Sequence, residues 1–333
     1  MTDRARRART RLGPAAAPEE RELRPGAFVG RYALLRRIGT GGMGEVWEAV
    51  DPAVTEPVAL KLLTFDLGSS AMQRFVRESN VARAVEHPNV VPTIDTGWWN
   101  GSPFLVMPLV RGTSLSELAR REGRMTLERV VSLLDGVARA LDALHEAGVV
   151  HRDVKPSNLL VTDEGDTVLL DFGLATLGED HLRLTRPGTV SGSPHYMSPE
   201  AAFGHVPDAR GDVYSLAAVA YRLLAGRPPI TGRDSIEVLS AKLSRTPPRL
   251  SSIGGPPSRA LDALLTSALS RDPSRRPASA GALLDQLRAI ASRVERVEDP
   301  APRPPDRSEL LAPATAIVVS IALALVVALL LGS

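Results

Sequence analysis

Apolar residues gather in short runs over the first third of the chain, and these runs predict β-strands. The strand-like runs cover 33–38, 45–49, 58–61 and 104–107, and each is of a length typical of a strand. Between the third run and the fourth, a helix is expected over 72–85. This part of the chain is therefore predicted to be a β-rich unit that carries one helix.

Further along, the apolar positions recur with the period of an α-helix. The longest such run extends from Leu127 to His145, with apolar residues at 130, 131, 134, 137, 138, 141 and 144. A shorter helix is expected after Ser114, whose spacing to Glu117 is a capping signal. Strands before and helices after indicate an α+β fold with two parts. The other predicted elements are helices over 236–243, 260–269 and 278–294, and a hairpin over 159–161 and 167–170.

One run near the end of the chain is apolar all round. Residues 314–331 contain only two polar side chains, Thr315 and Ser320. As a helix they would measure about 27 Å, close to the roughly 30 Å of a bilayer core. We expect a transmembrane helix over 312–332, because a buried helix of a soluble protein normally keeps a polar face. The proline-rich residues 294–311 before it predict a semi-rigid juxtamembrane linker.

Residues 1–31 are predicted to be a disordered, basic tail. Arginines at positions 4, 6, 7, 9 and 11 are followed by a stretch rich in proline and alanine with no apolar run, so the segment is not a secretory signal. Two interpretations stay open. The tail is solvated and has no partner, or it contacts anionic lipid headgroups beside the predicted membrane helix.

Composition narrows the classes of function. The 333 residues are 44% hydrophobic and 23% charged, which suits a soluble domain with a large core. The net charge of +2 gives no basic excess of the kind that nucleic-acid binding needs. Because the chain has no cysteine, disulfides, thiolate catalysis and cysteine-bound zinc are excluded.

The strongest candidate for chemistry is the octapeptide His-Arg-Asp-Val-Lys-Pro-Ser-Asn at 151–158. Asp153 can accept a hydrogen bond from an incoming hydroxyl group and take its proton. Lys155 brings a positive charge to a transferring phosphoryl group, and the amide oxygen of Asn158 is a hard ligand for Mg²⁺. Singly, each is an ordinary loop residue, but in this order they predict phosphoryl transfer.

A glycine-rich segment lies between the first two predicted strands. Glycines at 39, 41 and 44 form the pattern G-x-G-x-x-G, which lets the backbone approach phosphate oxygens closely. The same pattern can open the helix of a dinucleotide-binding fold, but here the strand-like run Val-Trp-Glu-Ala-Val follows it. We therefore expect a β-hairpin over a nucleotide.

Two further motifs follow the octapeptide. Asp-Phe-Gly begins at Asp171, and Gly-Ser-Pro-His-Tyr-Met-Ser-Pro-Glu occupies 192–200. Together with the Val-Ala-Leu-Lys run that ends at Lys61, this set resembles the eukaryotic-type protein kinases, in their Ser/Thr branch and most like the bacterial members. The resemblance implies a two-lobed kinase domain over 32–293, with a small β-rich N-lobe and a larger helical C-lobe.

The resemblance also implies a nucleotide site. Lys61 would bind the α- and β-phosphates with Glu78 as its ion-pair partner, and Asp171 with Asn158 would hold Mg²⁺ or Mn²⁺. Met107 would close the back of the adenine pocket, and the backbone after it would contact the adenine edge. The set expected around ATP is Ile38, Gly39, Thr40, Gly41, Gly42, Met43, Gly44, Val46, Ala59, Lys61, Met107, Pro108, Val110 and Leu160.

Other residues are expected to support the site. By the same resemblance, Ser193 would bond to the catalytic loop through its hydroxyl, and Glu200 would form a structural salt bridge with Arg276. Asp212, on a buried helix, would brace the backbone of the catalytic loop. His145 is interpreted as a packing or capping residue.

The polar residues after Asp171 are expected to form an activation segment. The resemblance implies that Arg152, directly before Asp153, marks a kinase whose activation segment is ordered by phosphorylation, and a guanidinium can bind a phosphate through charge-assisted hydrogen bonds. Because Thr185 and Thr189 stand at distances from Ser193 like those of phosphosites in similar kinases, autophosphorylation is expected at Thr185, Thr189 or both, between two copies of the chain. The alternative is that both are ordinary loop threonines.

The predicted function is that of an ATP-dependent serine/threonine protein kinase with the catalytic set Asp153, Lys155, Lys61 and Glu78. Its partners would be protein substrates, a second copy of itself and the membrane, and not nucleic acid. Arginines at 303 and 307 favour a single-pass protein with its kinase domain on the cytoplasmic side of the cytoplasmic membrane. The alternative is a membrane-tethered pseudokinase that binds nucleotide and partners without catalysis.

Overall fold

The computed structural model describes residues 23–41, 44–54, 56–63, 85–170, 194–255 and 258–298. The expected membrane helix over 312–332 lies outside these ranges, as does the helix expected over 72–85 apart from its last residue. Among the helices within the described ranges, none is both long enough and apolar enough to cross a membrane. The membrane helix therefore stays a prediction.

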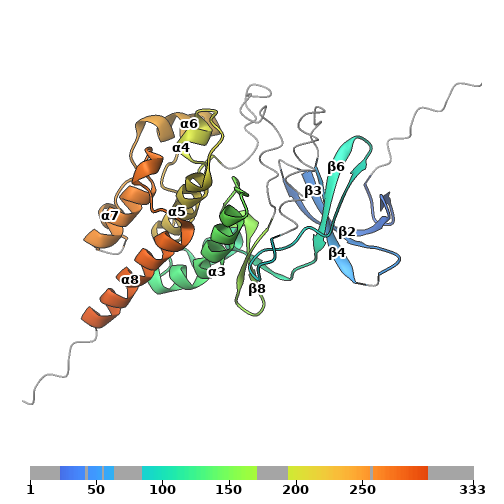
Figure 1. The fold of residues 1–333 in the computed structure, drawn as a ribbon, viewed down its shortest axis with the longest axis horizontal. Helices are drawn as coiled ribbons and strands as arrows, with labels where there is room; N and C mark the ends of the chain where they lie inside the picture. The colour runs from blue at the N-terminus through green and yellow to red at the C-terminus, as the bar shows by residue number, and fades with distance from the viewer. Residues whose placement is uncertain are drawn as a thin grey trace, which may run out of the picture. The chain divides into compact units, whose positions relative to one another are not determined.

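A six-stranded antiparallel sheet forms the first part of the structure (Figure 1). The strands predicted from the apolar runs are β2, β3, β4 and β6, so those four predictions are confirmed. The sequence missed β1 and β5. Residues 1–31 were predicted to be disordered, and this prediction is wrong for Phe28 and Val29, which form β1 and pair with β2. Strand β5 was missed because it is half-buried along its whole length. The bounds, in sheet order, are β1 (Phe28–Val29), β2 (Tyr32–Gly41), β3 (Gly44–Val50), β4 (Pro57–Leu63), β6 (Ser102–Pro108) and β5 (Asp95–Trp99).

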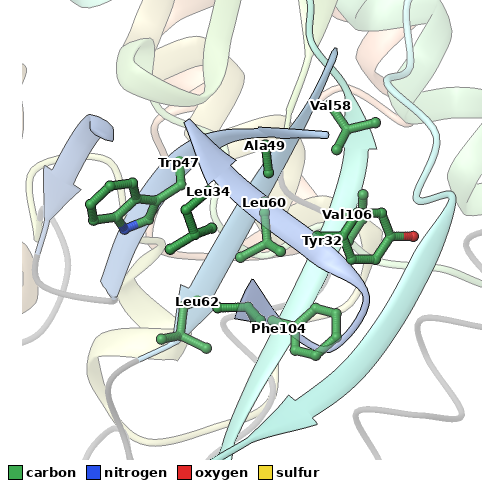
Figure 2. Close-up of a cluster of buried hydrophobic side chains, with 10 residues drawn as sticks. Tyr32, Leu34, Trp47, Ala49, Val58, Leu60, Leu62, Phe104 and Val106 are labelled. Atoms are coloured by element: carbon green, nitrogen blue, oxygen red, sulfur yellow. The ribbon is translucent and has the colours of Figure 1, made fainter. Parts of the chain in front are cut away.

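Apolar side chains from five strands of this sheet gather in one cluster (Figure 2). Trp47 of β3, Leu60 of β4 and Phe104 of β6 belong to it, and Leu60 has no exposed surface. The ring of Tyr32 on β2 meets that of Phe104 edge-on, and its hydroxyl group donates a hydrogen bond of 2.8 Å to Asp95 of β5. The cluster fixes the sheet that carries the glycine-rich hairpin and Lys61.

Helices dominate the second part. The helices predicted in this part and the small hairpin are confirmed, as is the first cap, where the hydroxyl group of Ser114 accepts from the backbone N–H of Glu117. The last helix continues to Glu298, so the predicted start of the linker at residue 294 is wrong. The helices are α2 (Leu115–Glu122), α3 (Leu127–Glu146), α4 (Pro199–Ala202), α5 (Ala209–Ala225), α6 (Ser235–Ser244), α7 (Arg259–Ala268) and α8 (Ala280–Glu298), with 3-10 turns at Pro156–Asn158, Ser251–Ile253 and Pro273–Arg275. A second sheet has the order β7 (Gly112–Ser114), β8 (Leu159–Thr162) and β9 (Thr167–Leu169).

The segment before β5 joins the first part to the small sheet. Leu169 of β9 donates its N–H to the carbonyl group of Asn89 at 2.8 Å and accepts from the N–H of Val91 at 3.0 Å. The amide group of Asn89 also donates to the carbonyl group of Thr167 at 3.0 Å. A Cβ at Gly136 of α3 would lie 2.2 Å from the Asn89 amide nitrogen. The close approach of Asn89 explains why a glycine stands in the middle of α3.

Candidate active site

The buried helix α5 supports the loop that contains the octapeptide. The carboxylate of Asp212 on this helix is fully buried. One of its oxygens accepts from the N–H of Arg152 at 2.7 Å, and the other accepts from the N–H of His151 at 2.7 Å and from Nε2 of His145 at 2.8 Å. Three donors compensate the buried charge, and two of them are successive amides of the loop.

This anchoring holds the loop in an uncommon backbone conformation. Arg152 has a φ of 63°, in the left-handed region that costs a residue with a side chain about 1–2 kcal/mol. The hydrogen bond from its N–H to Asp212 offsets that cost. Strain of this kind is often found at functional sites, and here it directly precedes Asp153.

The three polar residues singled out in the octapeptide lie in contact. Oδ2 of Asp153 accepts from Nζ of Lys155 at 2.6 Å and from Nδ2 of Asn158 at 2.9 Å. Nδ2 of Asn158 also donates to the carbonyl group of Asp153 at 2.9 Å. Because the amide nitrogen faces Asp153, the amide oxygen Oδ1 of Asn158 is the atom that remains for a ligand.

His151 ties this loop to the chain that leads to Asp171. Its ring is fully buried, and Nδ1 accepts from the N–H of Asp153 at 3.2 Å. The proton of the ring is therefore on Nε2, which donates to the carbonyl group of Leu170 at 3.1 Å. Leu170 also donates its N–H to the carbonyl group of Asn158 at 2.9 Å. The residue before Asp171 is thus fixed at both polar backbone atoms, while Asp171 itself lies outside the described residues.

Five residues of the set expected around ATP meet in one apolar cluster. Ala59 of β4 and Met107 of β6 are buried in it, and Val46, Val110 and Leu160 pack against them. Val46 comes from the six-stranded sheet, whereas Leu160 belongs to β8 of the second part. A cluster of apolar side chains supplied by two sheets is suited to a flat apolar ligand.

The glycine-rich segment is a hairpin, as predicted. Gly41 at the end of β2 pairs with Gly44 at the start of β3, and Gly42 with Met43 lie outside the described residues. Gly44 has a φ of +142°, and a Cβ there would lie 1.9 Å from the carbonyl oxygen of Leu62. The close approach of β4 therefore requires this glycine, for a reason that the sequence alone did not reveal.

The other expected ATP residues lie on the same strands. Ile38, Gly39 and Thr40 belong to β2, where the side chain of Ile38 is 39% exposed. Pro108 is the last residue of β6 and pairs with Val58 of β4.

Lys61 occupies the middle of β4, in register with Val46 and Leu105 of the neighbouring strands. It is 8% exposed, and a buried ammonium group needs compensation. Its expected partner, Glu78, lies outside the described residues.

A bidentate ion pair joins α4 to the chain after α7. Nη1 and Nη2 of Arg276 each donate to one oxygen of Glu200 at 2.7 Å, and Nη1 also donates to the carbonyl group of Arg210 on α5 at 2.9 Å. Burial alone would raise the pKa of Glu200, but the hydrogen bonds from Arg276 lead the opposing effects and the net pKa is lowered. The segment that ends at Glu200 is thereby attached to α5. Ser193, at its other end, is not among the described residues.

The family model of the protein kinase domain matches residues 32–287. The chain belongs to the protein kinase family. All the contacts described for the candidate active site fall within that range.

Three relatives of this kinase come from Mycobacterium tuberculosis and are named serine/threonine-protein kinases. The chain is 38% identical to PknH over 267 residues, 36% identical to PknA over 283 residues and 37% identical to PknE over 264 residues. These alignments cover 80%, 83% and 79% of the chain, but 42%, 64% and 46% of the relatives. The chain thus spans less than two thirds of the length of the curated relatives it matches.

Two polar contacts of the kinase domain were missed by the sequence analysis. His145 does not act through packing or capping alone, since it donates a hydrogen bond to the carboxylate of Asp212. Lys242 of α6 was not singled out, yet its Nζ donates to the carbonyl group of His195 at 2.9 Å. One signal could have found Lys242, because it stands four residues after Val238 and so shares the buried face of its helix.

Proposed function

We propose that this chain is a serine/threonine protein kinase of bacterial signalling, which transfers the γ-phosphoryl group of ATP to hydroxyl groups of proteins. The observation that carries the proposal is the contact of Asp153 with Lys155 and Asn158 in a loop that Asp212 anchors. The names of the relatives support the same class of acceptor.

In this proposal, Asp153 acts on the acceptor hydroxyl group. Lys155 and Asn158 both donate to Oδ2, and among the described residues no hydrogen bond occupies Oδ1, which makes it the oxygen available to the substrate. The hydroxyl oxygen forms a bond to the γ-phosphorus, the bond to ADP breaks, and the proton passes to Asp153. Lys155 offsets the negative charge of the phosphoryl group during the transfer.

The residues present fit ATP and Mg²⁺ or Mn²⁺. The apolar cluster around Ala59 and Met107 would take the adenine ring, with the carbonyl group of Pro108 and the N–H of Val110 at its edge. Pro108 has no N–H, and this arrangement requires none from it. The apolar cluster and these two backbone groups are therefore suited to an adenine ring.

The metal ion would be held by Oδ1 of Asn158 and the carboxylate of Asp171, which are hard oxygen ligands. When bound, the ion neutralises charge on the phosphates. Lys61 would bind the α- and β-phosphates, oriented by Glu78. These four residues would set the direction of the triphosphate toward Asp153.

The alternative, a pseudokinase that binds nucleotide without catalysis, would be expected to lack Lys61, Asp153 or Asp171. All three are present in the chain, so no observation favours the alternative.

The test is transfer of radiolabelled phosphate from ATP to casein by the wild type and by the Lys61→Met and Asp171→Asn variants. We expect both variants to fold and to lose activity by at least about 100-fold, because charge and metal positioning supply most of the catalysis. Folded variants that keep more than a few per cent of the wild-type rate would rule out these assignments.

We also propose that residues 312–332 anchor the protein in the cytoplasmic membrane with the kinase domain on the cytoplasmic side. Support comes from the apolar run of 314–331, which would bury its side chains in lipid. Deleting 310–333 should move the protein from the carbonate-washed membrane pellet to the supernatant with its activity intact. A full-length protein that stays in the supernatant would contradict the anchor.

A last proposal concerns activation. Thr185 and Thr189 lie outside the described residues. Phosphorylation of either or both by a second copy of the chain would add a phosphate that Arg152 can bind through charge-assisted hydrogen bonds. Mass spectrometry of the wild type and of Asp153→Asn should find phosphate on these threonines in the wild type alone. Unchanged activity after Thr185→Ala combined with Thr189→Ala would contradict the switch.

A further inference from the structure

Lys242 is a buried lysine outside the catalytic loop. It lies on α6, and its side chain is 1% exposed. Nζ donates to the carbonyl group of His195 at 2.9 Å and to the hydroxyl group of Tyr214 at 3.2 Å. It also lies 4.9 Å from the centre of the Tyr214 ring. The ammonium group thus bridges the segment before α4 and the helix α5.

The charge of Lys242 is only partly compensated. Among the residues described, no carboxylate lies within 4.0 Å of Nζ, although Glu200 is near enough to favour the charged form. The other charged and titratable groups around it are Tyr214, the imidazole of His195, and Arg276, whose guanidinium lies 5.1 Å from the centre of the same Tyr214 ring. Burial lowers the pKa of Lys242 to about 7. An apolar side chain of similar length would fill this space without that cost.

His195, which accepts the hydrogen bond from Lys242, is itself held at two atoms. The carbonyl group of His195 accepts from Lys242, and its ring donates from Nδ1 to the carbonyl group of Ile230 at 3.0 Å. Ile230 packs with Val238 and Ala241 of α6 in a small buried cluster. His195 is therefore held to the α6 region by a charged hydrogen bond from one side and a neutral one from the other.

The residue that Lys242 contacts on α5 lies close to the residue that anchors the catalytic loop. Tyr214, which Lys242 contacts, stands two residues after Asp212 on α5, and Asp212 holds the amides of the loop before Asp153. Asp212 and Tyr214 therefore connect one helix, α5, to two different segments, which are the catalytic loop and, through Lys242, residues 194–198. The position of residues 194–198 is in this way coupled to the position of the catalytic loop.

We propose that Lys242 is a positioning residue, which holds residues 194–198 in register with the loop of Asp153 so that the protein substrate meets a fixed surface. This inference rests on the proposed function, since it assigns a role in binding the protein substrate. Loss of the hydrogen bond from Lys242 leaves His195 with its ring bond to Ile230 alone, and the apolar cluster and the nucleotide site keep their own contacts. The loss should therefore weaken the binding of the protein substrate and leave the binding of ATP unchanged.

The first arm of the test needs no catalytic activity. Hydrogen exchange is measured on peptides that cover 194–204 in the wild type, in Lys242→Met and in Val238→Ala. Lys242→Met removes the donor and keeps the volume, and Val238→Ala loosens the same helix but keeps the donor. We expect exchange in this peptide to be on the order of tenfold faster in Lys242→Met than in Val238→Ala. Equal exchange in the two variants would overturn the proposal.

The second arm separates the two substrates. With casein as acceptor, Lys242→Met should raise the KM for casein on the order of tenfold, with the KM for ATP unchanged. A parallel rise in both constants, or in neither, would overturn the role in substrate positioning. If Lys242→Met does not fold, Lys242→Gln, which also lacks the charge, takes its place in both arms. A wild type without transferase activity would contradict the proposed function, and the exchange arm would still decide the role of Lys242.

Discussion

Two segments of the kinase are held against helix α5 by charges of opposite sign. The loop of Asp153 is held by a carboxylate of the helix itself, since Asp212 accepts from two backbone N–H groups. The segment of residues 194–200 is held by two cations from outside the helix, since Arg276 donates to Glu200 and Lys242 of α6 donates to the carbonyl group of His195. The carboxylate holds the loop by accepting from the amides of the loop, and the cations hold the segment by donating to oxygens of the segment. The sign of each buried charge matches the atoms that it contacts, which are N–H groups around Asp212 and oxygens around Arg276 and Lys242.

The two arrangements differ in how well the buried charge is satisfied. Asp212 receives three hydrogen bonds, and Arg276 has a bidentate carboxylate partner. Lys242 has a carbonyl group, a hydroxyl group and an aromatic ring instead. Burial disfavours the charged form of an amine, and with no carboxylate in direct contact among the described residues the pKa of Lys242 falls to about 7.

The largest effect is expected from removing the carboxylate of Asp212. Asp212→Ala leaves the N–H groups of His151 and Arg152 buried without an acceptor and should lower the free energy of unfolding by about 3–5 kcal/mol. Phosphate transfer should fall by at least about 100-fold, because the loop loses its anchor. Asp208→Ala is the matched control, since it removes the exposed cap of the same helix and should cost about 1 kcal/mol. Equal losses in the two variants would contradict the role of Asp212.

A smaller effect is expected from the paired cation. Arg276→Met leaves Glu200 half-buried without its partner and should lower the free energy of unfolding by about 2–3 kcal/mol, as measured by urea unfolding. Glu200→Gln alone should also destabilise, because it leaves the guanidinium of Arg276 buried. The double variant should recover part of the loss, since neither charge is then left alone. Strictly additive losses would show that the two residues are not coupled.

The smallest effect, counted per pH unit, is the pH dependence that Lys242 gives to the free energy of unfolding. Its pKa is lowered from 10.5 to about 7, so within this range the unfolded chain binds a proton that the folded chain does not. The free energy of unfolding of the wild type, minus that of Lys242→Met, should therefore rise with pH from about 7 upward, by at most about 1.4 kcal/mol per pH unit. Below pH 7 the difference should be constant. Urea unfolding of both proteins between pH 6 and 9 measures it, and parallel curves would contradict the account.

Sequence patterns predicted the elements whose signals are local. The helix α3 begins at Leu127 as predicted and ends at Glu146, one residue beyond the prediction, because its apolar period is unbroken. The cap at Ser114 was read from a spacing of three residues. By contrast, β5 was missed because its side chains face water and core about equally.

The same distinction holds in the candidate site. Asp153 contacts residues two and five positions away in the chain, so its surroundings could be read from one motif. The contacts of His145 with Asp212 and of Lys242 with His195 span 67 and 47 residues. Such contacts depend on how helices pack, and neither periodicity nor spacing along one segment reports that. Gly44 is a further case, since the strand that requires a glycine there is β4, which lies elsewhere in the chain.

The central claim is that Asp153 carries phosphate transfer to protein hydroxyl groups, and one measurement tests it most directly. Wild type and Asp153→Asn are compared for the formation of phosphoserine and phosphothreonine in casein with ATP and Mg²⁺, and for nucleotide affinity in the same buffer. We predict that the wild type forms both products, whereas Asp153→Asn binds nucleotide with unchanged affinity and transfers phosphate at least about 100-fold more slowly. An Asp153→Asn protein that phosphorylates casein at the wild-type rate would contradict the claim.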